Sequence, residues 1–274
     1  MFVFGVVATK GGVGKTTHSA NLGGLLADIG YRVLLIDADV QPSLSRYFAL
    51  SHESEHGLTR MVMSGALTSD CISEIALPPE NFQGDLNLLN VQGGCLHLVR
   101  SDTRDGKLQD WLSNRLDRLV RIRMAIKNAA VSGAYDVAII DTQGAVGHLQ
   151  DAAVNASDML ITPASPDIIS AREFVDGTVT LLERHESSAN MGFTVPPMRA
   201  IINRAERTVD SRAMSTLIRD QFMVLRGRVT VLHTVVPAAV AYRKAATDQV
   251  PVHWVDPRKA GDVTPPRVRE EAPA

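Results

Sequence analysis

Cysteine is scarce in this chain, and its two cysteines lie far apart. Among 274 residues only Cys71 and Cys95 are present, and they do not form a CxxC pair. A small disulfide-stapled domain needs several cysteines, and a structural zinc site needs clustered thiol or imidazole ligands. The sequence therefore excludes both as the basis of the fold and favours the reducing cytoplasm.

Long apolar segments and a large excess of one charge are also absent. No apolar run approaches the ~18 residues that a membrane-spanning helix requires. The first residues, MFVFGVVATKGG, lack the basic leader of a signal peptide. We therefore expect neither membrane insertion nor secretion. The formal charge is −2 at pH 7, so the chain as a whole is not a basic protein that coats nucleic acid.

The remaining composition is that of an ordinary globular protein, with 45% hydrophobic and 21% charged residues. Short apolar runs alternate with segments of helical periodicity. Strands are expected at 2–8, 32–36, 86–91, 137–140, 159–162, 199–202 and 230–236, and helices at 15–29, 107–131, 168–184 and 210–225. This alternation predicts an α/β fold, a mostly parallel twisted sheet with helices on both faces. We expect one domain over 1–256 and a flexible, proline-rich C-terminal tail over 257–274.

The segment 107–131 is predicted to be a single long helix that ends before Gly133. Its apolar residues would lie roughly on one side. They are Trp111, Leu112, Leu116, Leu119, Ile122, Met124 and Ile126.

A glycine-rich loop, KGGVGKTT at 10–17, follows the first predicted strand and opens the first helix. In that context glycines let successive backbone N–H groups converge on phosphate oxygens, and the helix N-terminus adds positive potential. Lys15 would reach the β- and γ-phosphates, and the Thr16 hydroxyl would bind Mg²⁺. The usual pattern has glycine at position 9, where this chain has Thr9, and the loop carries a second lysine, Lys10.

Carboxylates follow two of the predicted buried strands. Asp37 and Asp39 come after LLI at 34–36, and Asp141 comes after VAII at 137–140. Ligands of open α/β sheets bind at the carboxyl ends of the strands. We therefore expect the loop and these three carboxylates to share one crevice.

Three segments carry a family resemblance: the loop with its extra lysine, LLIDADVQPSLSRYF at 34–48 and YDVAIID at 135–141. With them the chain resembles the ParA/MinD family of deviant Walker ATPases, over residues 1 to about 256. The late segment VVPAAVAYRKAATDQVPV at 235–252 looks most like the compact ParA partition ATPases.

The resemblance implies a P-loop NTPase fold, ATP and Mg²⁺ as cofactors, and weak ATP hydrolysis. Lys10 would cross an ATP-sandwich homodimer to the nucleotide of the partner subunit, where a cation stabilises transition-state charge. Asp39 would orient or activate the attacking water, and Asp37 and Asp141 would hold Mg²⁺ through water. Asn203 would contact adenine, with the backbone near Pro237 closing that pocket. The loop residues that would bind the nucleotide are Gly11, Gly12, Val13, Gly14, Lys15, Thr16 and Thr17.

The chain departs from the family after its second acidic strand. A proline pair is usual there (DxPP), whereas this chain has Asp141-Thr142-Gln143-Gly144. The spacing still offers the Gly144 N–H to a γ-phosphate, and the Gln143 amide is a candidate for orienting water. The change concerns the hydrolysis rate and the switch geometry that the resemblance implies, and it need not abolish hydrolysis.

The near-neutral total charge conceals an uneven distribution. The window 199–244 holds nine basic and three acidic residues, an excess of six, so the other 228 residues carry a net −8. Such asymmetry favours contact with phosphate backbones, although a solvated helix face also fits. The residues assigned to DNA are Arg204, Arg207, Arg226, Arg228, Arg243 and Lys244.

The function that the resemblance implies is DNA segregation by a cytoplasmic, nucleoid-associated ATPase. An ATP homodimer would bind DNA non-specifically, and a centromere-binding partner of the ParB type would stimulate hydrolysis. Two alternatives stay open: a MinD-like or other positioning ATPase of the superfamily, and a nucleotide-gated scaffold with little hydrolysis. The tail VTPPRVREEAPA lacks the amphipathic basic helix of MinD-like membrane binding. The cysteines do not follow the acidic strand ends, which disfavours an iron–sulfur carrier.

Overall fold

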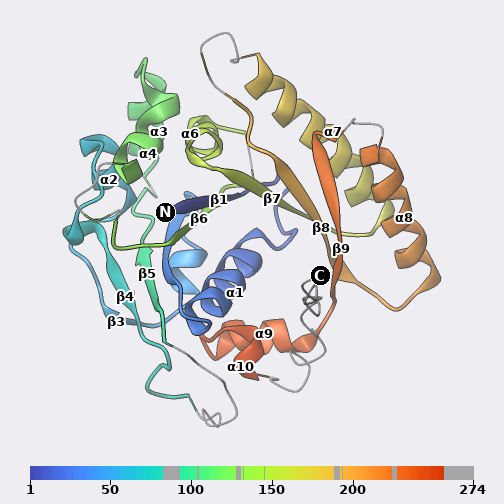
Figure 1. Ribbon diagram of the computed structural model, residues 1–274, viewed down its shortest axis with the longest axis horizontal. Coiled ribbons are helices and arrows are strands. Elements are labelled where there is room, and N and C mark those ends of the chain that lie inside the picture. The colour runs from blue at the N-terminus through green and yellow to red at the C-terminus, as the bar shows by residue number, and fades with distance from the viewer. Residues whose placement is uncertain are drawn as a thin grey trace, which may run out of the picture.

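The computed structural model describes residues 1–255 except 83–92, 104, 128–130, 132, 145, 188–191, 193 and 224–226, and also leaves the side chains of 168–173 undescribed. Nine strands of the described chain form one sheet in the order β3-β4-β5-β2-β6-β1-β7-β8-β9 (Figure 1). Their bounds are β1 Phe2–Val6, β2 Arg32–Ala38, β3 Leu50–His52, β4 Ser73–Ile75, β5 Cys95–Val99, β6 Val137–Thr142, β7 Met159–Ala164, β8 Met198–Ala205 and β9 Val229–Pro237. This confirms the predicted α/β fold.

The six pairings from β5 to β9 are parallel. At one edge of the described sheet, β4 pairs antiparallel with both β3 and β5. The central strands are buried along nearly their whole length, as in β6, where every residue is buried. Burial on both faces explains why these strands read as continuous apolar runs rather than as alternating patterns.

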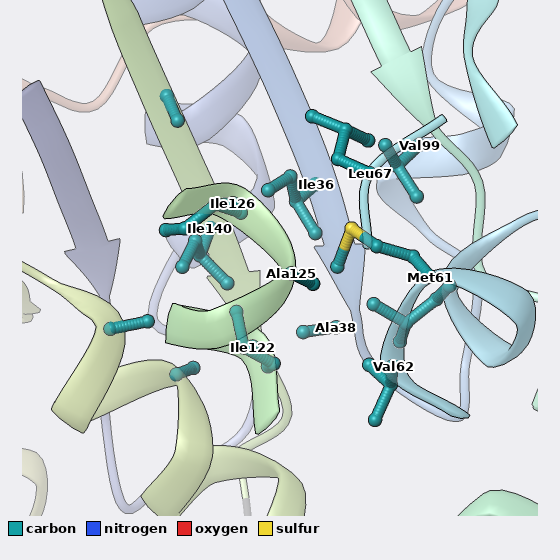
Figure 2. Close-up of a cluster of buried hydrophobic side chains, with 14 of the residues drawn as sticks. Ile36, Ala38, Met61, Val62, Leu67, Val99, Ile122, Ala125, Ile126 and Ile140 are labelled. Atoms are coloured by element: carbon teal, nitrogen blue, oxygen red, sulfur yellow. The ribbon is translucent and has the colours of Figure 1, made fainter. Parts of the chain in front are cut away.

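Helices cover both faces of the sheet. On one face, α1 (Lys15–Asp28) packs on side chains such as Val33 and Leu35 of β2. On the other face, Leu34 and Ile36 of the same strand pack in a second cluster. Figure 2 shows Ile36 within it. That cluster is covered by α2 (Leu58–Ser64), α3 (Lys107–Ser113), α4 (Arg121–Lys127) and α6 (His148–Ala156). The alternation of side chains along β2 thus places successive residues in different cores.

Beyond β7 the sheet is covered by a third cluster. Here α7 (Ile168–Glu186) and α8 (Val209–Met223) pack together beside β7, β8 and β9 (Figure 1). After β9 the chain returns toward α1 through α9 (Val240–Thr247) and α10 (Val252–Val255). α10 is held against α1 because the Trp254 indole N–H donates to the buried Asp28 carboxylate at 2.5 Å.

The prediction of one long helix over 107–131 is wrong. α3 ends at Ser113, a 3₁₀ turn follows at Arg118–Val120, and α4 starts at Arg121. The break has a local cause, because the side chains of Ser113 and Asn114 both donate to the Asp110 carbonyl, at 2.7 and 2.8 Å. Such side chains compete with the helical backbone. Leu116, expected on the apolar side, is fully exposed.

Three strands of the structure were not predicted, and one predicted strand is not tested. The predicted strand 86–91 lies outside the described residues, as does the predicted tail 257–274. β5, Cys95–Val99, pairs with β2, and neither it nor the short edge strands β3 and β4 were predicted. Strands of three residues carry too little periodicity to be found in a sequence. No helix in the described part of the chain is both long and apolar enough to span a membrane.

Candidate nucleotide-binding site

The loop at 10–17 connects β1 to α1 at the carboxyl end of the sheet. Gly12 and Gly14 have positive φ angles of 75° and 101°, a region that side chains with a Cβ disfavour. A Cβ on Gly14 would also collide with the side-chain amide of Asn203. Gly14 is the N-cap of α1, so the loop leads directly into the positive end of a helix, an arrangement suited to anions.

Lys15 is buried in the first turn of α1, with 7% of its surface exposed. Burial lowers its pKa, while the nearby carboxylates of Asp141 and Asp39 act in the opposite sense. A desolvated ammonium group held among carboxylates at the base of a loop is placed to attract phosphate.

Asp141 lies at the centre of the polar contacts behind the loop. Its carboxylate accepts hydrogen bonds from the Thr16 hydroxyl at 2.6 Å and the Ser19 hydroxyl at 3.0 Å. Burial raises its pKa to about 6, against the opposing effect of the Thr16 hydrogen bond and the Lys15 charge. Ser19 was missed by the sequence analysis, although it stands one helical turn after Lys15 and faces the same side.

Asp37 sits beside Asp141 because β2 and β6 pair in parallel with these two residues in register. It is fully buried and accepts hydrogen bonds from the Ser45 backbone N–H at 2.7 Å and the Ser45 hydroxyl at 2.6 Å. Burial, followed by the neighbouring Asp141 charge, raises its pKa to about 7. Ser45 was also missed, because nothing in its local sequence points back to β2.

The oxygen atoms gathered here are of the type that Mg²⁺ prefers. Thr16, Asp37 and Asp141 offer one hydroxyl and two carboxylates, and Mg²⁺ commonly keeps several waters and takes its other ligands from phosphate. Asp39 directly follows β2, the strand that carries Asp37, and is partly exposed. Its carboxylate accepts a hydrogen bond from the Gln41 backbone N–H at 2.9 Å. The site residues therefore fit the ion expected from the sequence.

A cavity of about 590 Å³ opens beside the loop, and Asn203 and Pro237 both line it. Thr17, His18, Tyr242 and Arg243 line it too. The Asn203 amide donates to the Val13 carbonyl at 2.7 Å, so β8 braces the loop from the side. Arg204, next in the chain, has a φ of 59°, which marks a bulge at the end of β8.

The segment that departs from the family pattern lies against the loop. A Cβ on Gly144 would lie 3.0 Å from both the N and Cα atoms of Gly11. The Gln143 side chain turns toward Gly147, where an added Cβ would meet its Nε2 at 2.5 Å. Gly144 therefore adjoins the loop, whereas Gln143 points toward the start of α6.

The residues assigned to DNA do not form a single patch. Arg204 and Arg243 line the cavity beside the loop. Arg207 and Lys244 are exposed to solvent and lie close to them in the sequence. Arg228 precedes β9 at the opposite end of that strand and pairs with Glu186 at 2.5 Å. A strand of this length spans roughly 25–30 Å, so Arg228 is remote from the others. Arg226 lies outside the described residues.

Comparison with known proteins connects this geometry to a family. The family model described as "AAA domain" matches residues 1–190. The chain belongs to the ParA/MinD family of P-loop ATPases. It is 27% identical over 264 residues to the sporulation initiation inhibitor protein Soj of Bacillus subtilis, covering 94% of this chain and 93% of Soj. It is also 27% identical to the septum site-determining protein MinD of that organism, over 73% of this chain and 63% of MinD.

A solved structure shows the same fold. The ATP complex of a Cyanothece McdA variant superposes with a TM-score of 0.74 at 21% identity, over 94% of this chain and 92% of that protein. This structure confirms the fold that the sequence predicts. The family itself is confirmed by the family model over residues 1–190.

Proposed function

We propose that this protein is an ATP-dependent DNA-segregating ATPase of the ParA type. The observation that carries the ATPase part is the arrangement of Lys15, Thr16, Asp37 and Asp141 at one helix N-terminus, with an adjoining cavity. Lys15 binds the β- and γ-phosphates, and Thr16 ligates Mg²⁺, which neutralises charge on the transferred phosphoryl group.

The remaining residues take roles around the same nucleotide. Asp37 and Asp141 hold Mg²⁺ through water, and Asp39 orients the attacking water from its partly exposed position. Asn203 and Pro237 border the adenine, since both line the cavity next to Thr17. The backbone N–H groups of Gly11, Gly12, Val13 and Gly14 contribute to the phosphate contacts.

In this proposal Lys10 acts across the interface of a homodimer. This residue lies on the part of the loop where Gly11 and Gly12 are exposed, beyond the buried Lys15. In an ATP-sandwich homodimer its ammonium group reaches the nucleotide of the partner subunit and stabilises the charge that develops during hydrolysis. The intrinsic rate is weak and a centromere-binding protein of the ParB type raises it.

DNA contact is assigned to the basic residues around the cavity end of the molecule: Arg204, Arg207, Arg243 and Lys244. Dimerisation doubles this group of charges, so that ATP controls affinity for the phosphate backbone without base recognition. Support comes from the local excess of positive charge in the window 199–244. Arg228 is less suited, because Glu186 neutralises it.

Two substitutions test the proposal. Lys15→Ala should abolish binding of Mg–ADP and Mg–ATP in calorimetry. Lys10→Ala should bind both, yet fail to dimerise with ATP in light scattering and release little phosphate. Normal hydrolysis by a monomeric Lys10→Ala variant would refute the sandwich dimer. If wild-type protein dimerises with ATP but releases no phosphate with DNA and partner present, it is a nucleotide-gated scaffold instead.

A further inference from the structure

A fully buried side chain, Gln150 on α6, joins the two segments that flank the phosphate loop. Its amide Nε2 donates to the Ala8 carbonyl at 3.2 Å and to the Gln143 carbonyl at 3.3 Å. Ala8 leads from β1 into the loop, and Gln143 directly follows β6. Gln150 has no role in the nucleotide contacts described above, so its burial between these two segments requires an explanation.

The two carbonyls occupy equivalent positions past the end of a strand pair. β1 and β6 pair in parallel, and their last pair in register is Val6 with Asp141. Ala8 and Gln143 each lie two residues further on, where the ladder has ended. The Gln150 amide therefore bridges the two segments just past the last backbone pair, with side-chain hydrogen bonds in place of backbone ones. One residue earlier, the Thr142 hydroxyl donates to the Val6 carbonyl at 2.9 Å and supports the same junction.

The position of this Gln150 bridge sets the spacing between Gly144 and the loop. Gly144 follows Gln143 directly, and an added Cβ on it would approach within 3.0 Å of the Gly11 backbone. Gly144 therefore lies close against Gly11, and because it is bonded to Gln143, a shift of the Gln143 carbonyl moves Gly144 relative to Gly11. The Gly144 N–H is a backbone donor next to the loop, which a proline at the same position could not supply.

The orientation of the Gln150 amide is fixed from the other side by α7. The Arg184 guanidinium donates to Gln150 Oε1 at 3.3 Å, and it lies 2.6 Å from the Asp151 carboxylate. His185 is buried nearby, with its Nε2 3.2 Å from the same carboxylate. A cation beside the amide oxygen turns the NH₂ group toward the two carbonyls. Gln150 thus connects the loop segments to the C-terminal end of α7.

We propose that Gln150 is the positioning residue that sets the distance between the Gly144 segment and the phosphate loop, and so determines how strongly the protein prefers ATP to ADP. The inference rests on the proposed nucleotide function. The γ-phosphate is the one group of ATP that ADP lacks, and it would lie between the loop and Gly144. Gln150 touches no nucleotide itself, and Arg184 of α7 holds its amide in this orientation.

The test is the ratio of the affinity for Mg–ATPγS to the affinity for Mg–ADP, measured by calorimetry on the whole protein. Gln150→Met keeps the volume and removes both donated hydrogen bonds. Its affinity for Mg–ADP should stay within about twofold of wild type, while that for Mg–ATPγS falls about tenfold, the loss expected from one or two net hydrogen bonds. Gln150→Glu keeps the acceptor toward Arg184 but has no donor, and should show the same loss.

A control and a second variant separate positioning from general stability. Gln221→Met, at an exposed site on α8, should leave both affinities unchanged. Arg184→Lys keeps a cation near Asp151 but removes the planar group from Gln150. It should lower the preference for ATPγS by a smaller factor, and it decides the matter if Gln150→Met does not fold.

The outcomes are distinct. Equal loss of both affinities, or a wild-type ratio in Gln150→Met and Arg184→Lys, overturns the inference, because a merely structural amide would not distinguish the two nucleotides. If wild-type protein binds neither nucleotide, the proposed function itself fails. A lowered ratio with intact Mg–ADP binding supports both.

Discussion

A glycine in the middle of α7 provides a quantitative test of how the phosphate loop is held. Gly177 packs against Thr9, the residue that stands where the usual loop pattern has glycine. A Cβ added to Gly177 would lie 2.8 Å from the Thr9 Cβ and 3.2 Å from its Cγ2. Carbon atoms pack at about 3.5–4.0 Å. Because the Thr9 Cβ is attached to the backbone, no side-chain rotation relieves this overlap, and Gly177→Ala must displace the loop or the helix.

Two opposing effects determine how much Gly177→Ala changes the free energy of unfolding. Overpacking of this kind costs about 1–3 kcal/mol, whereas replacing a glycine by alanine inside a helix gains up to about 1 kcal/mol. Gly177→Ala alone should therefore lower the free energy of unfolding by about 0–3 kcal/mol. In a Thr9→Gly background the overlap is gone, and the same substitution should raise it by up to about 1 kcal/mol.

Urea unfolding of the wild type, Gly177→Ala, Thr9→Gly and the double variant measures the coupling free energy between the two sites. It should be about 1–3 kcal/mol. Mg–ADP affinity should fall in Gly177→Ala and recover when Thr9→Gly is added, because residue 9 opens the loop. Gly133→Ala, with nothing within 4 Å of an added Cβ, should respond equally in both backgrounds. If Gly177→Ala costs the same with and without Thr9, the contact does not explain the glycine.

Three further results are expected. Burial raises the pKa of Asp37 to about 7, above an unfolded-state value of about 3.9. The folded protein without nucleotide therefore binds this proton more tightly than the unfolded chain, and its stability should fall by a few kcal/mol as pH rises from about 4 to 7. Asp37→Asn should flatten that profile in urea titrations at pH 5 and pH 8, and an unchanged profile would contradict the assignment. Arg207→Glu combined with Lys244→Glu should weaken ATP-dependent DNA retention at least about tenfold at low salt, with Mg–ADP affinity unchanged. Arg228→Glu should have a smaller effect on retention, and equal effects would refute the proposed surface. Asn203→Leu removes the brace on the loop and should weaken Mg–ADP binding about tenfold, the value of a buried hydrogen bond; calorimetry showing wild-type affinity would exclude that role.

The phosphate loop and the acidic strand ends could be predicted because their chemistry is local. Glycines with positive φ, a lysine and a threonine at a helix start, and an aspartate after an apolar strand are all read within a few residues. The order of strands and helices likewise follows from short-range periodicity. The broken helix after Ser113 could not be predicted, since the competing hydrogen bonds to the Asp110 carbonyl depend on where those side chains turn.

The sequence by itself thus determined the family, the α/β class and the residues that meet at the carboxyl end of the sheet. Only the tertiary structure decided which side chains support them. Ser45 reaches Asp37, and Gln150 reaches the carbonyls of Gln143 and, 142 residues away, Ala8. No local sequence pattern indicates these contacts. Packing also separated Arg228 from the other basic residues, because β9 runs between them. Such contacts arise from how the layers pack, and packing depends on the whole chain at once.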